Sequence, residues 1–195
     1  RKAACHVLIF LHLQKLYSSK QFLDEVRCLF NRLPSGIDDD SFTVRNEGRI
    51  DPSTIFRISS KYFFSNIDIT EFKTKAEQFS LNNIDILIRK SALERIKWHQ
   101  KNDHKVVVVS ASIDCWLKPW CDKNHIDLIA TQLEVNNNKL TGRLNSKNCF
   151  GSEKVRRIMG KYKLSNYDYI YAYGDSRGDY EMLQISSEKS YRPFR

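Results

Sequence analysis

The chain has 195 residues, of which 41% are hydrophobic and 28% charged, a balance typical of a folded domain with its own core rather than of a disordered segment. The 32 Lys and Arg residues exceed the 23 Asp and Glu residues, so the formal charge is +9, and this excess favours anionic partners such as phosphates. The positive residues form no dense block along the chain, which disfavours a dedicated nucleic-acid-binding face.

The cysteines and the lengths of the apolar runs indicate the cellular compartment in which the protein is expected. The five cysteines are odd in number and no two have CxxC spacing, which argues against a disulfide framework or a zinc knuckle and favours reduced thiols. No apolar run approaches the roughly 18–20 residues that span a membrane. The start RKAACHVLIFLHL resembles a signal peptide, but His6 and His12 interrupt the run and no small-residue cleavage site follows. We therefore expect a cytoplasmic protein without a membrane span.

The first predicted element is a short buried strand over residues 6–11, where the run HVLIFL is apolar. A mostly helical region follows, from about residue 18 to residue 101. Its first helix, SSKQFLDEVRCLFNRL, has apolar residues at helical spacing, and the turn-rich PSGIDDDSFTVRNEGRIDPS favours a loop. The segment DITEFKTKAEQFSLNNIDILIRKSALERIKWHQKNDH predicts two further helices.

From residue 105 the predicted strands and helices alternate. KVVVVSAS has the continuous apolar run of a parallel strand buried on both faces, and IDCWLKPWCDKNH follows as a helix. IDLIATQLEV and KLTGRL predict a strand and a hairpin around Asn136-Asn137-Asn138, and Ser152 is the expected cap of the helix GSEKVRRIMGKYKL. DYIYAYGDSRGDYEML predicts a strand, a tight loop and a helix, and EKSYRPF a last strand. This alternation predicts an α/β fold with a doubly wound parallel sheet.

Four polar residues follow strand ends or begin a helix in this region. Ser110 comes just after VVVV, Lys154 lies on the first turn of a predicted helix, and Asp175 and Asp179 surround a glycine loop. Open α/β sheets bind ligands at the carboxyl edge, where such residues meet. Carboxylates suit Mg²⁺, and a hydroxyl with an ammonium suits phosphate oxygens. Each residue alone is more often a cap, a solvated side chain or a turn residue, so the order and spacing carry the signal.

In that order and spacing the sequence resembles the haloacid dehalogenase-like (HAD) superfamily, in its phosphoserine-phosphatase-like branch. VVVVSASIDCWLKPW resembles motif II, NCFGSEKVRRI motif III and YAYGDSRGDYEML motif IV, and the final YRPF is similar to the ending of this branch. The resemblance covers Val106 to Phe194. It implies a HAD-like Rossmannoid core formed by residues 1–17 and 102–195, with residues 18–101 as an inserted helical cap.

The resemblance also implies roles for the four polar residues. Ser110 and Lys154 would bind the phosphoryl group of a phosphorylated small molecule. Asp175 would be a ligand of Mg²⁺, the cofactor of the family, and Asp179 would support the metal site.

Motif I of the family, Asp-x-Asp-x-Thr at the end of the first strand, is where this sequence departs from the pattern. In the family the first Asp attacks phosphorus and the second is the general acid and base. An ungapped alignment of IFLHLQKLYSSKQFL puts Leu11 at the nucleophile position, Leu13 at the acid–base position and Lys15 at the Thr position. Leucine has no lone pair with which to attack phosphorus or to carry a proton, so the resemblance implies a protein without its catalytic aspartates.

A second candidate for motif I is Asp38-x-Asp40, which puts Phe42 at the Thr position. It lies in the turn-rich stretch with only Ile37 as an apolar neighbour before it, so a solvated acidic loop is the better interpretation.

These observations favour a degenerate HAD protein that binds a phosphorylated ligand or a partner without turnover. Without a metal, Asp175 and Asp179 would be close like charges, so we expect Lys15 to form a salt bridge with one of them. An active Mg²⁺-dependent phosphatase is an alternative, with Ser110 or His12 as nucleophile, although strand alternation puts His12 on the face opposite Leu11. A basic binding module for nucleic acid or another acidic partner is a second alternative.

Overall fold

The computed structural model describes residues 7–11, 60, 61 and 63–194 of the chain. Two compact units are distinguished within these residues. The first holds residues 7–11, 76–132 and 146–194, and the second holds residues 60–75 apart from residue 62, together with residues 133–145. Much of the predicted cap at residues 18–101 lies outside the described residues, so its boundaries stay a prediction.

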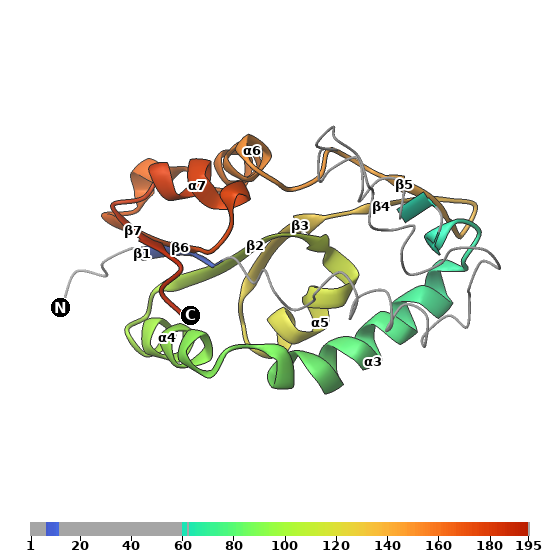
Figure 1. Cartoon of the computed structure of the whole chain (residues 1–195), viewed down its shortest axis with the longest axis horizontal. Helices are drawn as coiled ribbons and strands as arrows, with labels where there is room; N and C mark the ends of the chain where they lie inside the picture. Colours follow the sequence, from blue (N-terminus) through green and yellow to red (C-terminus); the bar gives the residue numbers. More distant parts are fainter. Residues whose placement is uncertain (1–6, 12–59, 62, 195) are drawn as a thin grey trace, which may run out of the picture. The chain divides into compact units, whose positions relative to one another are not determined.

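Strands and helices alternate along the described chain, as the sequence predicts from residue 105 onward (Figure 1). The elements are β1 (Val7–Leu11), α3 (Ile69–Leu87), α4 (Lys90–Lys101), β2 (Lys105–Ile113), α5 (Asp114–Lys123), β3 (Asp127–Thr131), β4 (Leu133–Asn136), β5 (Lys139–Leu144), α6 (Ser152–Lys161), the 3-10 turn η1 (Leu164–Asn166), β6 (Tyr169–Gly174), the 3-10 turn η2 (Arg177–Asp179), α7 (Tyr180–Gln184) and β7 (Glu188–Tyr191).

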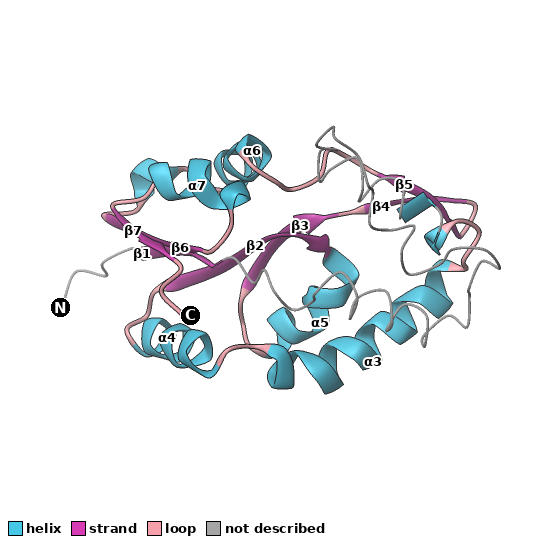
Figure 2. Cartoon of the chain, viewed as in Figure 1, coloured by secondary structure: helices cyan, strands magenta, loops and turns pink. Residues whose placement is uncertain are grey.

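The sheet of the first unit has the strand order β3-β2-β1-β6-β7, and all neighbouring strands are parallel. β1 is therefore the central strand, and the backbone of Leu11 at its end is aligned with Val108 of β2 and Tyr173 of β6. Helices α4 and α5 cover one face of the sheet, and α6 and α7 cover the other (Figure 2). This arrangement confirms the predicted doubly wound α/β fold.

The core of this unit explains the long apolar run of β2. Residues Val106 to Val109 are at most 3% exposed, because a strand inside a doubly covered sheet is buried on both faces. One cluster of buried residues combines side chains of the sheet with side chains of α6 and α7: Val107, Val109, Ile129, Cys149, Ile158, Ile170, Ala172, Met182 and Leu183.

The second unit contains the antiparallel hairpin β4–β5, which confirms the hairpin predicted around Asn136-Asn137-Asn138. Asn137 and Asn138 have φ angles of 48° and 59°, the left-handed conformations that a tight hairpin turn requires and asparagine tolerates. The N–H of Asn66 donates to the carbonyl of Leu140 at 2.8 Å, and that of Ile69 to Asn138 at 2.9 Å. The hairpin is thereby joined to the start of α3.

The start of α6 differs from the prediction in one detail. Ser152 is the first helical residue, and the N-cap is Gly151 with φ 60°, without a side-chain capping bond. Gly151 can adopt this left-handed conformation without the steric cost that a Cβ brings, and its N–H donates to the carbonyl of Gly178 at 3.0 Å. The chain therefore enters α6 through a contact with the η2 turn rather than through a serine cap.

Three of the five cysteines lie within the described residues. Cys115, Cys121 and Cys149 are free thiols, whereas Cys5 and Cys28 lie outside the described residues. No helix in this part of the chain is long and apolar enough to cross a membrane.

Candidate functional site

The predicted site residues gather at the carboxyl edge of the sheet. Leu11 is the last residue of β1, Ser110 lies near the end of β2, and Asp175 directly follows β6. Lys154 lies on the first turn of α6 and Asp179 at the end of η2. Ser110, Lys154 and Asp179 are each at most 1% exposed. The parallel sheet thus brings these strand ends together, because all its strands point the same way.

Lys154 and Asp179 form a buried ion pair. The Nζ atom of Lys154 donates to Oδ1 of Asp179 and to the carbonyl of Val109, both at 2.8 Å, and both charged side chains have no exposed area. Burial lowers the pKa of Lys154, and the neighbouring carboxylate opposes that shift. Because Val109 precedes Ser110, the ammonium is held at the strand end that carries the serine.

The loop after β6 wraps around the other carboxylate oxygen of Asp179. Oδ2 accepts hydrogen bonds from the N–H of Asp175 at 3.1 Å, the N–H of Ser176 at 2.9 Å and the hydroxyl of Ser176 at 2.8 Å. A Cβ atom on Gly174 would lie 2.5 Å from the Cβ of Asp179, so only glycine allows this close approach. Asp179 therefore shapes the loop through Oδ2 and binds Lys154 through Oδ1.

Ser110 lies at an irregularity of β2. Its pairing with β3 shifts register between Ser110 and Ile113, and its Oγ accepts the N–H of Ser112 at 3.1 Å. A bulge at a strand end alters the direction of the side chains around it and is common beside binding sites. The buried hydroxyl belongs to the same strand end as Val109, whose carbonyl binds Lys154.

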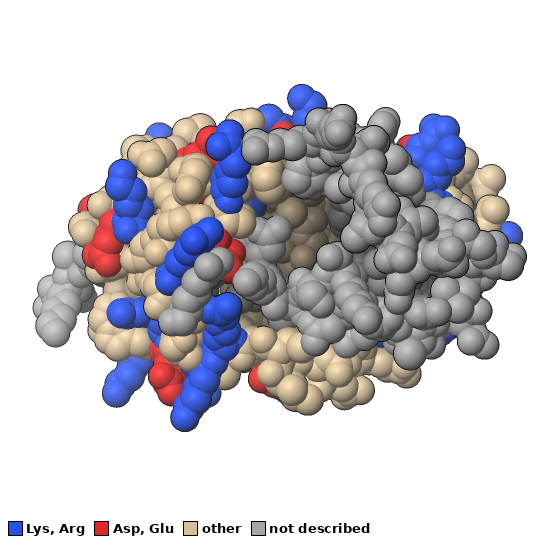
Figure 3. Space-filling model, in the orientation of Figure 1, with Lys and Arg blue, Asp and Glu red and all other residues tan. Residues whose placement is uncertain are grey.

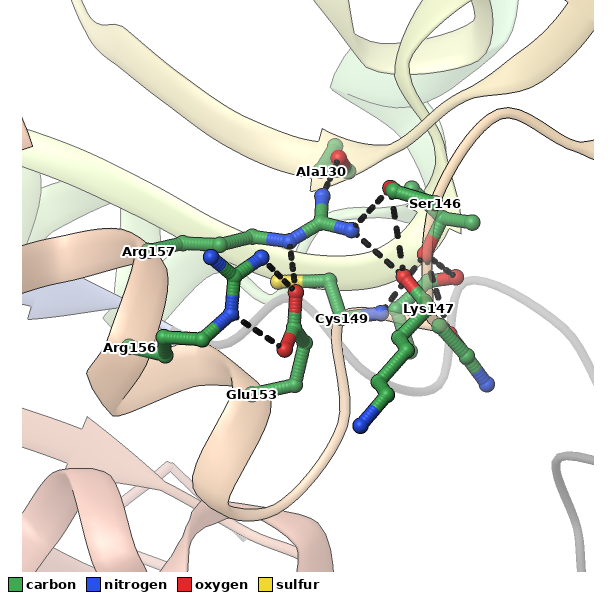
Figure 4. Close-up of polar contacts among 10 residues, drawn as sticks. Ala130, Ser146, Lys147, Cys149, Glu153, Arg156 and Arg157 are labelled. Atoms are coloured by element: carbon green, nitrogen blue, oxygen red, sulfur yellow. Dashed lines mark hydrogen bonds and ion pairs between the residues drawn. The ribbon is translucent and has the colours of Figure 1, made fainter. Parts of the chain in front are cut away.

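The first turn of α6 is held by an ionic network that sequence reasoning missed (Figure 4). Glu153 accepts hydrogen bonds from Arg156 at 2.6 and 2.7 Å and from Arg157 at 2.8 Å. Arg157 also donates to the carbonyl of Ala130 at 2.6 Å and to Ser146 and Lys147. The hydrogen bond from Arg156 is the largest of the effects that lower the pKa of Glu153 to about 2. The network ties Glu153, the neighbour of Lys154, to the end of β3 and to the segment before α6.

A second polar cluster includes a residue near the end of β6, and sequence reasoning missed this cluster as well. His99 is fully buried, with Nδ1 2.9 Å from Nδ1 of His104 and Nε2 2.9 Å from the hydroxyl of Tyr173. Burial, aided by the nearby charges of His104 and Arg95, lowers the pKa of His99 to about 4. Tyr173 directly precedes Gly174, so the cluster supports the strand end from which the Asp175 loop begins. The only sequence signal for it was a histidine on an apolar helix face.

Several predicted residues cannot be placed, because His12, Leu13, Lys15, Asp38 and Asp40 lie outside the described residues. The predicted salt bridge from Lys15 to Asp175 or Asp179 therefore stays a prediction. On the face drawn in Figure 3, the Lys and Arg side chains of the described residues are scattered among acidic and uncharged ones.

The fold agrees with membership of the haloacid dehalogenase-like hydrolase family. A family model described as haloacid dehalogenase-like hydrolase matches residues 55–184, more than half of the chain, and the chain belongs to that family. The matched stretch includes Ser110, Lys154, Asp175 and Asp179, and it begins after Leu11. The resemblance of the sequence to this superfamily is thereby confirmed.

Individual relatives extend this result. Protein CicA of Caulobacter vibrioides is 29% identical over 153 residues, which are 77% of this chain and 66% of that protein; the chain thus spans just under two thirds of the curated relative. A protein of unknown function from Bordetella pertussis Tohama I has a similar structure, with a TM-score of 0.75, 18% identity, and coverage of 94% of this chain and 88% of that one. A substrate-bound phosphoserine phosphatase has a TM-score of 0.66 at 17% identity, with coverage of 95% and 85%. These solved structures share the fold of phosphoserine-phosphatase-like HAD hydrolases.

The described residues at the sheet edge supply at most part of the Mg²⁺ site that the family implies, since the Leu11 side chain offers a metal no oxygen. The described residues contain no group of three or more His, Cys, Asp and Glu side chains that could hold a metal ion. Both oxygens of Asp179 accept hydrogen bonds from Lys154 and from the loop. Asp175 is then the carboxylate of this edge to which a metal role can be assigned, and one or two carboxylates are what Mg²⁺ in phosphate sites usually takes, so a role of Asp175 as Mg²⁺ ligand stays a prediction.

Proposed function

We propose that this chain is a HAD-family protein that binds a phosphorylated small molecule and does not hydrolyse it. The observation that carries the proposal is the position of Leu11. Leu11 ends the central strand, with its backbone aligned with Val108 and Tyr173. This is the strand end where the family mechanism requires an aspartate, and a leucine side chain offers no nucleophile.

The binding half of the proposed site rests on Ser110 and Lys154. A buried hydroxyl and a buried ammonium at one strand end can each donate to a phosphate oxygen. The ammonium is already held by Val109 and Asp179 at 2.8 Å, so its position is fixed before a ligand binds. Because Leu11 offers a metal no side-chain oxygen at the end of β1, we expect phosphate binding that does not depend on Mg²⁺.

The decisive experiment is a phosphatase assay with p-nitrophenyl phosphate and Mg²⁺ on the parent chain and on the triple variant Leu11→Asp, Leu13→Asp, Lys15→Thr. We expect no metal-dependent turnover by the parent and measurable turnover by the variant, because the substitutions restore the nucleophile and the acid–base group. Turnover by the parent that disappears with EDTA would establish the alternative, an active Mg²⁺-dependent phosphatase.

Binding is tested separately by titration calorimetry with inorganic phosphate. We expect Ser110→Ala to weaken phosphate binding roughly tenfold, since a hydrogen bond to a charged group is worth about 1.5–3 kcal/mol. Ser112→Ala is the matched control, because Ser112 lies on the same strand and contacts Ser110 through its backbone N–H. Equal affinities of parent and Ser110→Ala would contradict the assignment of Ser110.

A further inference from the structure

The turn that ends helix α4 brings two histidines into contact, away from the residues of the proposed phosphate site. The N–H of His104 donates to the carbonyl of His99 at 3.1 Å. The N–H of Asp103, whose φ angle is 59°, donates to the carbonyl of Gln100 at 3.0 Å. These two bonds around a left-handed residue form a Schellman motif. The side chains at the positions of His99 and His104 are frequently apolar in this motif and pack on each other, whereas here both are imidazoles.

The two imidazoles approach each other through their Nδ1 atoms, which are 2.9 Å apart. The other ring nitrogen of His99, Nε2, lies 2.9 Å from the hydroxyl of Tyr173. When Nε2 carries the proton and donates it to that hydroxyl, Nδ1 keeps its lone pair. Metal-binding histidines are oriented in the same way, by a hydrogen bond from the ring nitrogen that does not bind the metal.

Aromatic rings fix the directions of both imidazoles. The ring of His104 is stacked on that of Tyr171, with the centroids 6.1 Å apart and the planes at 16°. The ring of His99 lies 4.8 Å from that of Trp98 and 5.1 Å from that of Tyr171. His99 has no exposed area, whereas His104 is partly exposed. The pair is therefore positioned by packing, and one of its members is open to solvent.

The charge state of the pair suits a metal ligand. Burial lowers the pKa of His99 to about 4 and also lowers the pKa of His104, so both imidazoles are neutral at neutral pH, the form that binds metal ions. The charge of Asp103 opposes the shift at His104, and the negative end of the α4 dipole lies at the same turn. Both favour a cation at this place, whereas the charge of Arg95 near His99 acts against it.

The distance between the two nitrogens indicates the class of metal. Nitrogens 2.9 Å apart subtend about 90° at an ion held about 2.05 Å from each, a usual length for a metal–imidazole bond. This angle separates neighbouring ligands in a square-planar or tetragonal site, typical of Cu²⁺ and Ni²⁺, and is smaller than the tetrahedral angle of Zn²⁺ sites. The described residues form no group of three or more His, Cys, Asp and Glu side chains for a metal, so water would fill the other positions.

We propose that His99 and His104 bind one divalent transition-metal ion of tetragonal geometry, Cu²⁺ or Ni²⁺. The ion joins the last turn of α4 to the residue that directly precedes β2, and its binding therefore stabilises the folded protein. This site uses imidazole nitrogens rather than the oxygen ligands of a Mg²⁺ site. It shares no residue with the proposed phosphate site, and it stands whether or not that site binds phosphate.

The test is titration calorimetry with Ni²⁺ on the full chain and on three variants. His104→Gln removes the partly exposed ligand and leaves the buried His99 in place. Tyr173→Phe removes the hydroxyl that lies beside Nε2 of His99. His125→Asn is the matched control, because His125 is an exposed histidine with φ 56° in the turn that ends α5, and asparagine tolerates this left-handed conformation. Circular dichroism establishes that each variant is folded.

We expect one Ni²⁺ ion per parent chain and a higher melting temperature with the ion. His104→Gln should abolish this binding, and Tyr173→Phe should weaken it about tenfold, as for other residues that orient a metal-binding histidine. His125→Asn should change neither the affinity nor the melting temperature. With Cu²⁺, electron paramagnetic resonance of the parent should show coupling to two imidazole nitrogens, a result that does not depend on whether any variant folds.

Three outcomes overturn the inference. A parent chain that binds no Ni²⁺ lacks the site, and the contact between His99 and His104 is then only a hydrogen bond between imidazoles. Binding that survives His104→Gln, or that is lost in His125→Asn, shows adventitious binding elsewhere on the chain. Coupling of Cu²⁺ to a single nitrogen shows that the two imidazoles do not share an ion.

Discussion

The ammonium of Lys154 and the carboxylate of Asp179 lie 2.8 Å apart, and neither side chain has any exposed area. Burying two charges costs free energy that their mutual attraction and further hydrogen bonds must offset. Here those further bonds go to Val109 on β2 and to the Asp175–Ser176 backbone. The pair thus joins three segments far apart in the sequence, and its geometry sets the geometry of the proposed site.

We predict that Lys154→Met lowers the free energy of unfolding by about 3–5 kcal/mol, because it leaves the buried Asp179 carboxylate without its cation. The measurement is urea denaturation followed by circular dichroism. Adding Asp179→Asn should recover part of the loss, since the amide oxygen can still accept the loop N–H groups while the charge is gone. A loss below 1 kcal/mol in Lys154→Met would show that the pair is not buried as described.

Arg157 and Arg156 offer a matched comparison, because both donate to Glu153 but differ in exposure. The side chain of Arg157 is 14% exposed and that of Arg156 is 69% exposed. We predict that Arg157→Gln destabilises the protein by about 2–3 kcal/mol, since it leaves buried acceptors unsatisfied. Arg156→Gln should cost less than about 1 kcal/mol, as exposed ion pairs do. Equal losses in the two variants would contradict the network in Figure 4.

From the Glu153 network we expect the protein to lose folding stability in acid. The pKa of Glu153 is about 2 in the folded protein, against 4.5 for the free side chain. A carboxyl with a lowered pKa contributes its stability fully above pH 4.5 and loses it as the pH falls toward 2. We expect the free energy of unfolding to drop by up to about 3 kcal/mol over this range. In Glu153→Gln the drop should be smaller, and identical curves for parent and variant would refute the assignment.

The buried imidazole of His99 leads us to expect a separate loss of folding stability, at higher pH than the loss due to Glu153. Its pKa falls from 6.5 to about 4 on folding, so between these values the unfolded chain binds the extra proton. Stability from the buried neutral imidazole is therefore complete above pH 6.5 and declines as the pH falls to 4. Nuclear magnetic resonance of the imidazole nitrogens should show His99 neutral at pH 5.5. A titration midpoint of the His99 imidazole near pH 6.5 would mean that His99 is not held in the His104–Tyr173 cluster.

A substitution at Gly178 tests the contact between the segment before α6 and the η2 turn. A Cβ on Gly178 would lie 2.3 Å from the ring of Phe150, so Gly178→Ala must displace the ring and should cost about 1–3 kcal/mol. Gly160 is the control, because its Cβ would meet nothing within 4 Å and it lies within helix α6. Gly160→Ala should stabilise the protein by up to about 1 kcal/mol. A neutral Gly178→Ala would contradict the close packing of Phe150.

The parallel sheet and the meeting of the site residues at its edge could be predicted from local patterns in the sequence. The continuous apolar run of β2 required burial on both faces, and alternation with helices required parallel strands. Parallel strands bring their carboxyl ends to one edge, which is why Ser110, Asp175 and Asp179 could be expected together. The strand order itself, with β1 between β2 and β6, has no signal in these local patterns, because strands far apart in the sequence pair with each other.

The polar clusters could not be predicted, because their partners are distant in sequence and their bonds go to backbone atoms. Arg157 reaches the carbonyls of Ala130 and Lys147, which any residue type would supply. The near neighbours Glu153 and Arg157 indicated at most an exposed helical pair. Arg192, with a φ angle of 57° in the left-handed region, likewise has no signature in residue type, because arginine is not a residue that prefers this conformation.

The central place of β1 also governs the order in which the protein can fold. Val7 pairs with Tyr169, and Leu8 pairs with Lys105, so the contacts of this strand span almost the entire chain. Closing such long loops is slow relative to forming helices and local hairpins. During synthesis β2 and β3 can pair before β6 has formed, and β6 cannot join β1 until the residues through Gly174 have emerged. β1 is therefore among the last of the described strands to gain both its neighbours, and until then its edge toward β6 is unpaired and open to aggregation.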